Sequence, residues 1–294
     1  MPELPEVETI VCGLQKKIAW KKIVDVRVML PRIIRGDAGD FIAMATGTTI
    51  QKVWRRGKMI VIDLCEGKSL LVHLKMTGQL LYLSGNAPVA KHTHLILELS
   101  DGHQLRYLDM RQFGYLCLTD ASMVQGLTPS GAEPLEISWG EFKGLIQSRK
   151  AQVKPLLLNQ SFLAGIGNIY ADEILHKAGI HPLQRSHTLC ESQITRLYYV
   201  MREVLRQAIE QRGSSISDFV DSAGQKGNYQ KYHRVYQWQG EPCFTCQEKI
   251  VRIKIGGRSS YFCPCCQKNK GEAMQRSCVE YSCCEFFPLT NRKK

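Results

Sequence analysis

The sequence predicts an α+β protein in which a β-rich segment is followed by a helical segment and a small hairpin module. Three observations support this fold class. Short apolar runs of strand length dominate residues 23–118, helical periodicity dominates residues 138–211, and paired cysteines flank an alternating stretch near the C-terminal end. Because strands and helices occupy separate parts of the chain, an antiparallel arrangement is favoured over alternating β-α-β units.

The chain is expected to open with a helix. Apolar residues recur there at helical spacing, at Val7, Ile10, Val11, Leu14 and Ile18. Proline and an acidic residue are both favoured in the first turn of a helix, and Pro5 and Glu6 occupy those places. The spacing predicts that one face of this helix packs against a core.

Between residues 23 and 118 the pattern changes to short β-like runs. The runs read VDVRVML, MIVIDL, LLVHL, HLILEL, LRYLDM and YLCL. Turn-forming residues separate them, as in Ser84-Gly85-Asn86 and Asp101-Gly102. Several short strands at these spacings predict an antiparallel sandwich or barrel.

A linker and a set of helices follow the strands. The segment 127–137 contains two prolines and a glycine and is predicted to connect two domains. Ser138 and Glu141 have the spacing of a capping box, which predicts a helix start. A long amphipathic helix is expected over residues 192–211. The polar segment 214–237, with its glycines and tyrosines, is expected to include a mobile loop.

Charge and hydropathy narrow the class of partner. The chain carries 39 Lys and Arg against 27 Asp and Glu, a formal net charge of +12. Such an excess attracts polyanions, so nucleic acid is the first partner class to consider. The apolar runs are short and interrupted by charge, so no transmembrane helix and no membrane partner are expected. The N-terminal residues also lack the pattern of a secretory signal.

The twelve cysteines fall into two populations. Four are scattered among apolar neighbours and are expected to be small buried side chains: Cys12, Cys65, Cys117 and Cys190. The other eight lie between residues 243 and 284. In a chain without a recognisable secretory signal, such clustering favours metal binding over disulfides.

Four of the clustered cysteines have the spacing of a closed tetrahedral zinc site. The pairs are Cys243-x-x-Cys246 and, sixteen residues later, Cys263-x-x-Cys266. The alternating segment between them is predicted to form a hairpin. A module this small needs a metal to fold, so one structural Zn²⁺ per chain is expected.

The remaining cysteines of this cluster leave alternatives open. Cys265 could replace Cys266 as a ligand, but Cys266 is preferred because it keeps the two-residue gap. Cys278, Cys283 and Cys284 are assigned to a disordered tail in preference to a second metal site.

The first residues carry groups suited to covalent catalysis. Removal of Met1 would leave Pro2 with a free secondary amine. An α-amino group titrates with a pKa of about 8, so part of it is unprotonated and nucleophilic near neutral pH. Attack on a sugar C1′ would give an iminium ion that favours elimination of phosphate. Glu3, beside it, could exchange protons with the sugar oxygen or with Pro2.

Motifs spread from the N-terminus to the cysteine module resemble those of the bacterial formamidopyrimidine-DNA glycosylase family, whose relatives include the endonuclease VIII type. The matching motifs are Pro2-Glu3-Leu4-Pro5-Glu6-Val7-Glu8-Thr9, Arg56-Gly57-Lys58, His73-Leu74-Lys75-Met76-Thr77-Gly78, Lys91-His92, Arg111-Gln112-Phe113-Gly114, Lys154-Pro155-Leu156-Leu157-Leu158 and Gly165-Ile166-Gly167-Asn168-Ile169-Tyr170-Ala171-Asp172-Glu173. The resemblance implies an N-terminal antiparallel β-sandwich with an N-terminal helix. It further implies a C-terminal helical domain with a helix-two-turns-helix element and a zinc-finger β-hairpin.

By this resemblance, the catalytic set contains four residues. Pro2 is the nucleophile and Glu3 the acid and base. Lys58 contacts phosphate near the lesion and assists elimination, and Arg258, just past the hairpin turn, reaches phosphate. Glu6 is expected to be structural, as a carboxylate in the first turn of the opening helix.

The resemblance also implies how an oxidised base is reached. An enzyme acting on a base inside a duplex must flip the nucleotide out and fill the gap. The gap-filling residues correspond to Met76, Arg111 and Phe113, and the arginine can also bind the orphaned partner base. The segment 218–236 resembles a loop that closes over the flipped purine.

The remaining implied DNA contacts are mostly to phosphate. They involve His92, Lys154 and Asn168, in addition to Arg111 and Arg258. Two residues depart from the family pattern. Lys75 stands where glycine is frequent, and Gln112 stands where a basic residue is usual, so DNA affinity is expected to be altered.

The function expected is that of a bifunctional DNA glycosylase and abasic-site lyase. It would excise oxidised purines from double-stranded DNA and cut the strand at abasic sites. Two alternatives remain: an endonuclease VIII-type enzyme for oxidised pyrimidines, and a non-catalytic binder of damaged DNA. The expected domains are a catalytic sandwich (1–130), a helical domain (131–237), a zinc finger (238–270) and a disordered tail (271–294). A monomer in the bacterial cytoplasm, associated with the nucleoid, is expected.

Overall fold

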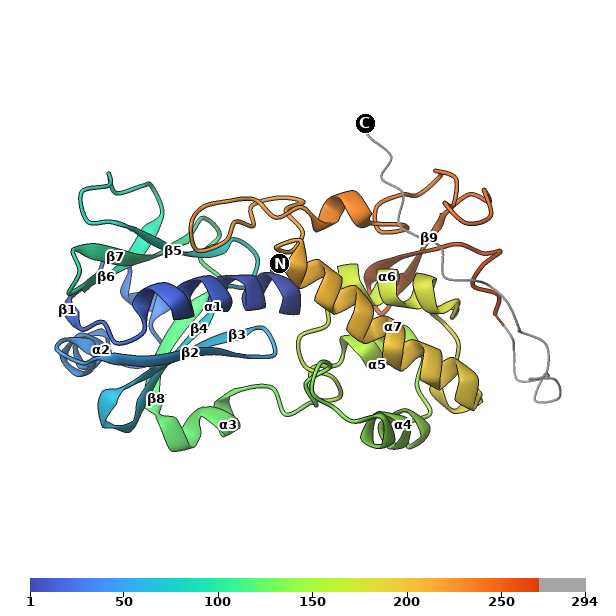
Figure 1. Cartoon of the computed structure of the whole chain (residues 1–294), viewed down its shortest axis with the longest axis horizontal. Helices are drawn as coiled ribbons and strands as arrows, with labels where there is room; N and C mark the ends of the chain where they lie inside the picture. The colour runs from blue at the N-terminus through green and yellow to red at the C-terminus, as the bar shows by residue number, and fades with distance from the viewer. Residues whose placement is uncertain (270–294) are drawn as a thin grey trace.

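The computed structural model describes residues 1–269 and places them in two lobes (Figure 1). Strands from the first half of the chain form one lobe, and helices from the second half form the other. Helix α1, Leu4–Ile18, extends from one lobe to the other, so the N-terminus lies in the middle of the molecule. The α+β class and the separation of strands from helices are confirmed.

The N-terminal lobe contains two separate four-stranded antiparallel sheets. Of the two architectures predicted from the sequence, it is therefore the sandwich and not the barrel. The strand orders are β1-β6-β7-β5 and β2-β3-β4-β8. The strands are β1 Ile23–Val28, β2 Ile50–Arg56, β3 Met59–Leu64, β4 Lys68–His73, β5 Gly78–Ser84, β6 Thr93–Leu99, β7 His103–Asp109 and β8 Tyr115–Asp120.

Two of these strands, β2 and β5, are absent from the runs that the sequence indicated. The sequence of β2 is IQKVWRR, and only two of its seven residues are buried. Such a strand has little hydrophobic signal of its own and forms because β3 pairs with it along its length. The pairing matters for the site, since the β2–β3 turn consists of Gly57 and Lys58.

Helix α1 packs against the cores of both lobes. All five apolar positions that predicted it are buried, and they belong to the sandwich core. Leu4, at its first turn, belongs instead to the core of the helical lobe. The Leu4 N–H donates a hydrogen bond of 3.0 Å to the Gly165 carbonyl. The first turn of α1 is therefore fixed against the helical lobe.

The second lobe is built from helices α4 to α7. Ser138 and Glu141 form the predicted capping box, with the Ser138 N–H donating to the Glu141 carboxylate at 3.0 Å and the Glu141 N–H donating to Ser138 Oγ at 3.3 Å. No helix of residues 1–269 is long and apolar enough to cross a membrane. The helices beyond α1 are α2 Ala38–Ala45, α3 Val124–Leu127, α4 Trp139–Gln147, α5 Val153–Leu158, α6 Asn168–Ala178 and α7 Glu191–Glu210.

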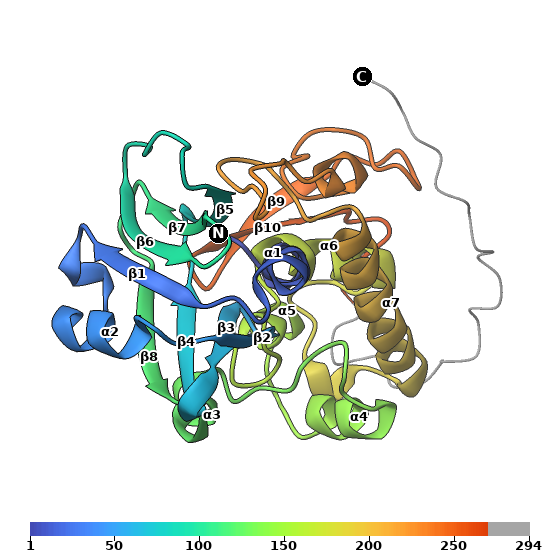
Figure 2. The same ribbon diagram turned by 60° about the vertical axis from the view of Figure 1, so that its left-hand side comes forward.

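A two-stranded hairpin completes the described chain. Strands β9, Val251–Ile255, and β10, Arg258–Phe262, pair antiparallel with Ile255 opposite Arg258. The two glycines of the turn both have positive φ, 54° and 76°, which is the backbone that a tight two-residue hairpin needs. Seen along α1, the hairpin lies beside the N-terminus (Figure 2).

The expectation for the scattered cysteines was wrong. Cys12 is exposed, and Cys65, Cys117 and Cys190 are only partly buried. Apolar neighbours in sequence do not decide which face of an element a residue occupies: Cys12 lies on the outer face of α1, whereas Val11 beside it is buried. The tail from residue 270, with Cys278, Cys283 and Cys284, lies outside the described residues.

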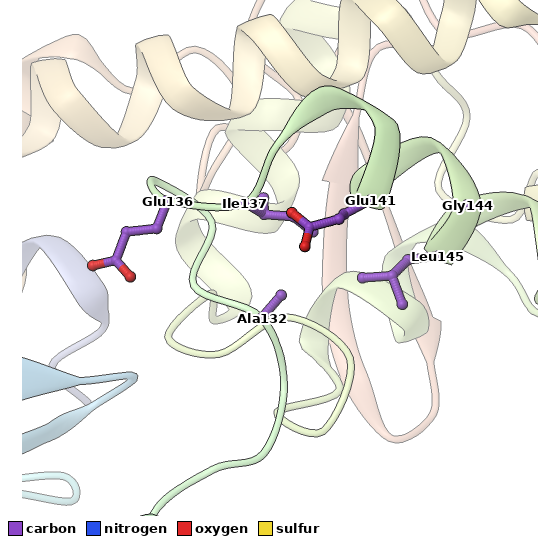
Figure 3. Close-up of a pocket in the computed structure, with 6 residues that line it drawn as sticks. All are labelled: Ala132, Glu136, Ile137, Glu141, Gly144 and Leu145. Carbon is purple, nitrogen blue, oxygen red and sulfur yellow. The ribbon is translucent and has the colours of Figure 1, made fainter.

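A hollow of about 590 Å³ lies between the interdomain linker and α4 (Figure 3). It shares no residue with the predicted site. Its lining residues are Ala132, Glu136, Ile137, Glu141, Gly144 and Leu145.

Candidate active site and DNA interface

The N-terminal residues lie against the start of α6. The Glu3 carboxylate accepts hydrogen bonds from the backbone N–H of Gly167 at 2.8 Å and of Ile169 at 3.0 Å. A third bond, of 3.3 Å, comes from the Tyr170 N–H. These amides form the positive end of the helix dipole, so they favour a negative charge at this position. Glu3 is only 3% exposed, and its orientation is fixed.

The glycines of the Gly165-Ile166-Gly167 segment make room for this arrangement. A Cβ on Gly167 would lie 2.2 Å from Glu3 Cδ, and one on Gly165 would lie 2.8 Å from Leu4 Cβ. Glycines at a helix N-terminus can also bring its amides close to a phosphate group. In this structure the amides of α6 bind a carboxylate of the same chain, which occupies the same donors.

Pro2 is buried beside Glu3, and its nitrogen is in a peptide bond with the exposed Met1. A peptide nitrogen is not a nucleophile, since its lone pair is delocalised into the carbonyl. Removal of Met1 would place a free secondary amine at this position. The structure therefore brings Pro2 and Glu3 together at the junction of the two lobes.

Glu6 joins three segments of the chain at the same junction. Its carboxylate accepts hydrogen bonds from the Glu3 N–H at 2.8 Å, the Tyr170 hydroxyl at 2.5 Å and the Ser214 N–H at 2.7 Å. Burial, reinforced by the nearby charge of Glu3, raises the pKa of Glu6 to about 7. Its contacts fit the structural role expected from the sequence, although they reach well beyond the first turn of α1.

Lys58 is held at the β2–β3 turn. Gly57 precedes it with φ of 56°, and a Cβ there would lie 3.2 Å from Ala164 Cβ and from Pro129 Cγ. The turn is thus enclosed between the linker and the loop before α6. Glycine is required at this position for its backbone angle and for the close approach.

Glu133 in the linker fixes this turn, and sequence reasoning missed it. Its carboxylate accepts hydrogen bonds from Gly57 N–H at 2.6 Å, from Arg55 at 2.7 Å and from Arg56 at 2.9 Å. Arg55 also pairs with Glu8 of α1 at 2.7 Å. The only sequence signal is an acidic residue in a linker, because its partners lie more than seventy residues away.

The Lys58 side chain is 6% exposed, and the structure records no hydrogen bond from its ammonium to any of residues 1–269. Burial lowers the pKa of Lys58; the nearby charge of Glu3 opposes this change, and that of Arg258 adds to it. Arg258, at the exposed start of β10, is therefore close enough to act on Lys58 electrostatically. Glu3 and Arg258, from two other segments of the chain, thus both lie within electrostatic range of Lys58.

Lys154 is not where a phosphate contact would require it to be. Its side chain is 0% exposed, and its ammonium forms an ion pair of 2.7 Å with Asp172. It also donates to Ser260 Oγ at 2.7 Å and to the Ser259 carbonyl at 3.0 Å. Because every direction around the ammonium is occupied by protein, Lys154 connects α5 and α6 to the zinc hairpin in this structure.

Asn168, the first residue of α6, lies next to this network. Its side-chain amide donates to the Ser259 carbonyl at 3.0 Å, while its Oδ1 has no hydrogen-bond partner among the described residues. Asn168 therefore lies between the start of α6 and the hairpin strand that carries Arg258. Its position is compatible with the predicted contact to DNA.

The three predicted gap-filling residues lie on two neighbouring loops and are exposed. Met76 is 41% exposed and follows β4, whereas Phe113 is 57% exposed and follows β7. The Arg111 guanidinium lies over the Phe113 ring, 4.8 Å from its centroid. Single exposed apolar side chains are common, but Met76 and Phe113 lie on two loops joined by a hydrogen bond, and Phe113 also packs against Arg111. This grouping fits a role in contact with a ligand.

Several loop residues near them have left-handed backbone angles. Lys75 has φ of 51° and Gln112 has φ of 57°, and both precede a gap-filling residue. The frequent glycine at the position of Lys75 is explained by this angle. His92, at the start of β6, has φ of 65° and is half-buried.

The segment 218–236 extends from the helical lobe across α1 to the sandwich (Figure 1). Phe219 is buried in the sandwich core. The Tyr82 N–H of β5 donates to the Ser222 carbonyl at 2.8 Å, and the Gln79 amide donates to the Asp218 carbonyl at 2.8 Å. At its other end, Glu173 of α6 accepts hydrogen bonds from three successive backbone N–H groups, 234–236. The segment thus covers the junction where Pro2 lies.

Four cysteine sulfurs gather at the base of the hairpin, those of Cys243, Cys246, Cys263 and Cys266, all within 4.8 Å of one another. Tetrahedral zinc with Zn–S bonds of 2.3 Å requires sulfurs about 3.8 Å apart. Three pairs lie at 3.3, 3.5 and 3.9 Å, so the donor set fits one structural Zn²⁺. Cys265 is exposed and outside the group, which confirms the preference for Cys266.

Comparisons with known proteins agree with this arrangement. Three family models match successive parts of the chain: the formamidopyrimidine-DNA glycosylase N-terminal domain over residues 1–116, the formamidopyrimidine-DNA glycosylase H2TH domain over 131–220, and a zinc finger found in FPG and IleRS over 240–269. The chain is 50% identical to the formamidopyrimidine-DNA glycosylase of Pelotomaculum thermopropionicum and 42% identical to that of Desulforamulus reducens. In both cases 92% of the chain and the whole of the relative are covered.

Solved structures support the same relationship. The fold is similar to that of Lactococcus lactis Fpg, with a TM-score of 0.85 and 36% identity over 91% of this chain and 100% of that one. Those structures contain DNA with a Fapy-dG lesion in one case and with an abasic site in the other. The chain therefore belongs to the formamidopyrimidine-DNA glycosylase family, the bifunctional glycosylase and abasic-site lyase enzymes that remove formamidopyrimidines and oxidised purines in base excision repair.

Proposed function

We propose that Pro2, once Met1 is removed, attacks the C1′ atom of an oxidised purine nucleotide in duplex DNA. The nitrogen lone pair forms the N–C1′ bond, and the glycosidic bond breaks with its electrons on the departing base. Glu3 takes the proton that the Pro2 nitrogen loses after the N–C1′ bond forms, and it passes this proton to the sugar ring oxygen as the nitrogen lone pair opens the ring to an iminium ion. Loss of a C2′ proton then drives β-elimination of the 3′ phosphate, and δ-elimination of the 5′ phosphate follows.

The observation that carries this proposal is the position of Glu3. Its carboxylate is held by the amides of α6 directly beside the residue that becomes the N-terminus. A proton carrier must lie within hydrogen-bond reach of the group it serves, so a fixed carboxylate beside the amine supports an acid and base role. The unpaired ammonium of Lys58 supports charge stabilisation at the departing phosphates.

The proposed DNA contacts use exposed and partly exposed residues of the site. His92, Asn168 and Arg258 bind phosphates around the lesion, with Arg258 reaching the strand from the hairpin turn. Met76, Arg111 and Phe113 fill the space left by the flipped nucleotide. Lys154 is proposed to act indirectly, by holding the hairpin against α6 through Asp172 and Ser260.

We further propose that the enzyme works as a monomer in the bacterial cytoplasm, associated with the nucleoid, on double-stranded DNA that contains oxidised bases or abasic sites. The DNA would lie across the junction of the lobes. The proposed domain limits are 1–130, 131–237 and 238–270, with 271–294 as a tail. The net charge of +12 supports a polyanionic partner.

Borohydride trapping tests the mechanism. Zinc-loaded protein with Met1 removed is incubated with a duplex containing 8-oxoguanine opposite cytosine, and the adduct is mapped by mass spectrometry. An adduct at Pro2 is expected. Pro2→Gly tests the requirement for a secondary amine, and protein retaining Met1 is a matched control that should form no adduct. A non-catalytic binder would form none in any state.

A 5,6-dihydrouracil duplex tests substrate class in the same assay. Faster trapping with 8-oxoguanine is expected, and faster trapping with dihydrouracil would move the protein to the endonuclease VIII type. The assay must compare the rates of trapping on the two duplexes, not only whether an adduct forms. A solved complex of the Lactococcus lactis protein contains oxidised-pyrimidine DNA, so binding of such DNA alone would not separate the two types.

A further inference from the structure

The gap-filling residues depend on the protein beneath them for their positions. Met76, Arg111 and Phe113 are exposed, and among their side chains the structure records only the contact of Arg111 with Phe113. Side chains in solvent do not fix one another in a single geometry, since ordering them is opposed by rotamer entropy. Their placement must come from the backbone of the two loops.

A single buried carboxylate contacts both loops. Asp109, the last residue of β7, is 1% exposed. Its Oδ1 accepts hydrogen bonds from the Thr77 hydroxyl at 2.5 Å and from the Arg111 N–H at 3.2 Å. Its Oδ2 accepts one from the Gly114 N–H at 2.8 Å and a longer one from the Tyr107 hydroxyl at 3.4 Å. No ion-pair partner of Asp109 is recorded in residues 1–269, so these donors replace its lost hydration.

Three of the four donors belong to the gap-filling loops, and the fourth, the Tyr107 hydroxyl, belongs to β7 itself. Thr77 directly follows Met76, Arg111 contributes its own backbone N–H, and Gly114 directly follows Phe113. The Thr77 hydroxyl oxygen also accepts a bond of 3.0 Å from the Arg111 N–H, which connects the two loops directly.

The local packing leaves little freedom for another arrangement. A Cβ on Gly114 would lie 1.8 Å from the Tyr107 hydroxyl and 3.1 Å from Asp109 Oδ2. Gly114 can therefore approach the carboxylate only because it has no side chain. Lys75 and Gln112 have left-handed backbone angles in the same two loops, and the hydrogen bonds to Asp109 offset that strain.

From this geometry we propose that Asp109 is the positioning residue of the gap-filling set: it fixes Met76, Arg111 and Phe113 relative to one another and thereby sets how well Arg111 reads the partner base. This rests on the proposed function, in which those three residues enter the duplex. Asp109 itself contacts neither DNA nor the reacting atoms.

The test uses substitutions that change hydrogen bonding with little change in volume. Asp109→Asn replaces one acceptor by an NH₂ donor, so at least one of the N–H or O–H groups it faces is left without a partner. Thr77→Val removes the hydroxyl that connects the loops, and Thr77→Ser restores it. Asp120→Asn is the matched control, because Asp120 also ends a strand but is exposed and pairs with Lys68.

Two substrates separate gap filling from chemistry. Single-turnover rates are measured on a duplex with 8-oxoguanine opposite cytosine, and borohydride trapping on a single-stranded oligonucleotide with an abasic site, which has no gap to fill. Asp109→Asn and Thr77→Val are expected to slow the duplex reaction about tenfold. Trapping on the single strand should stay at the wild-type rate. Thr77→Ser and Asp120→Asn should behave as wild type on both.

The partner base supplies a readout that general damage to the fold would not move. The ratio of rates with cytosine and with adenine opposite the lesion should approach one in Asp109→Asn, whereas partial unfolding would lower both rates equally. The proposal is overturned if Asp109→Asn or Thr77→Val keeps the wild-type duplex rate, or if both substrates slow equally. If Asp109→Asn does not fold, Thr77→Val decides. Wild-type protein that traps neither substrate would overturn the proposed function instead.

Discussion

Two regions of this molecule each bury a lysine, and they treat it in opposite ways. Around Lys154, the ammonium is surrounded by Asp172, Ser260 and the Ser259 carbonyl. Around Lys58, the structure records no hydrogen bond or ion pair to the ammonium within residues 1–269. Burial lowers the pKa of both groups.

The difference separates support from chemistry. A buried charge is unfavourable unless it is paired, and the partners of Lys154 within the protein compensate its charge, so it has a structural role. Lys58 lacks such compensation, which fits a group whose partner is supplied by a bound phosphate. Both lysines belong to motifs that resemble those of the family, and the resemblance alone implied similar roles for them at phosphate.

Removal of zinc is expected to have the largest effect on stability, and this effect should be confined to the region around Lys154. Structural zinc contributes about 10 kcal/mol or more to the folding of small modules. Chelation should unfold residues 243–266 and release Lys154 from the hairpin. Hydrogen exchange should then rise there and around Asp172, while β3 stays protected. Loss of protection throughout the sandwich would contradict the idea that the two regions are separately held.

Matched substitutions of the two lysines should give opposite results. Lys154→Met leaves Asp172 buried without its partner and is expected to lower the free energy of unfolding by about 3–5 kcal/mol. Lys58→Met removes an uncompensated charge and should change it by less than about 1 kcal/mol, while slowing the lyase reaction about 100-fold. Urea unfolding and borohydride trapping measure these effects.

The control for that pair is Lys143→Met, since Lys143 forms an exposed ion pair with Glu191. Its effect on stability should be below about 1 kcal/mol, with no effect on trapping. Equal destabilisation by Lys58→Met and Lys154→Met would remove the distinction between the regions.

The pH dependence of the unfolding free energy should report on Glu6, whose charge acts on Lys58. Its pKa rises from 4.5 to about 7 on folding, so the folded state holds a proton that the unfolded state releases. The contribution to stability is present below pH 4.5 and is lost as the pH rises to about 7. The change is at most about 3 kcal/mol.

Glu6→Gln should flatten this pH profile of the unfolding free energy, because glutamine does not titrate. Both proteins should retain Met1, by inhibition of methionine aminopeptidase during expression, since a free Pro2 amine would add a charge nearby. The slope is the readout, and an unchanged slope in Glu6→Gln would show that another group titrates.

The smallest effect concerns the loops that flank the site. Lys75→Gly relieves a backbone angle of 51° and should stabilise the protein by less than about 1 kcal/mol. If Lys75 contacts a DNA phosphate, its loss should also reduce the magnitude of the slope of log affinity against log salt concentration by about one, the value for one phosphate contact. Gln112→Gly, at a similar angle of 57°, is the uncharged control and should leave the salt slope unchanged.

Much of the site could be predicted because its groups lie in local motifs. The paired cysteine spacing predicted four sulfurs that the structure brings together, and the opening residues predicted a helix, which has Glu3 as its N-cap and Pro2 just before it. The roles of Glu133 and Asp109 could not be predicted. The partners of Glu133 are distant in sequence, and the sequence does not show that the Asp109 side chain points inward between two loops. Lys154 shows the same limit, since a motif gives a residue's identity but not which way it faces.

The sequence by itself therefore determined the order of elements, the metal ligands and the chemical groups at the N-terminus, because periodicity, spacing and residue chemistry are local properties. Only the tertiary structure decided which carboxylate meets which donor: Glu3 on the amides of α6, Asp109 under the gap-filling loops, and Asp172 on Lys154. These pairings follow from burial, since a carboxylate removed from water must find donors wherever the packed chain brings them.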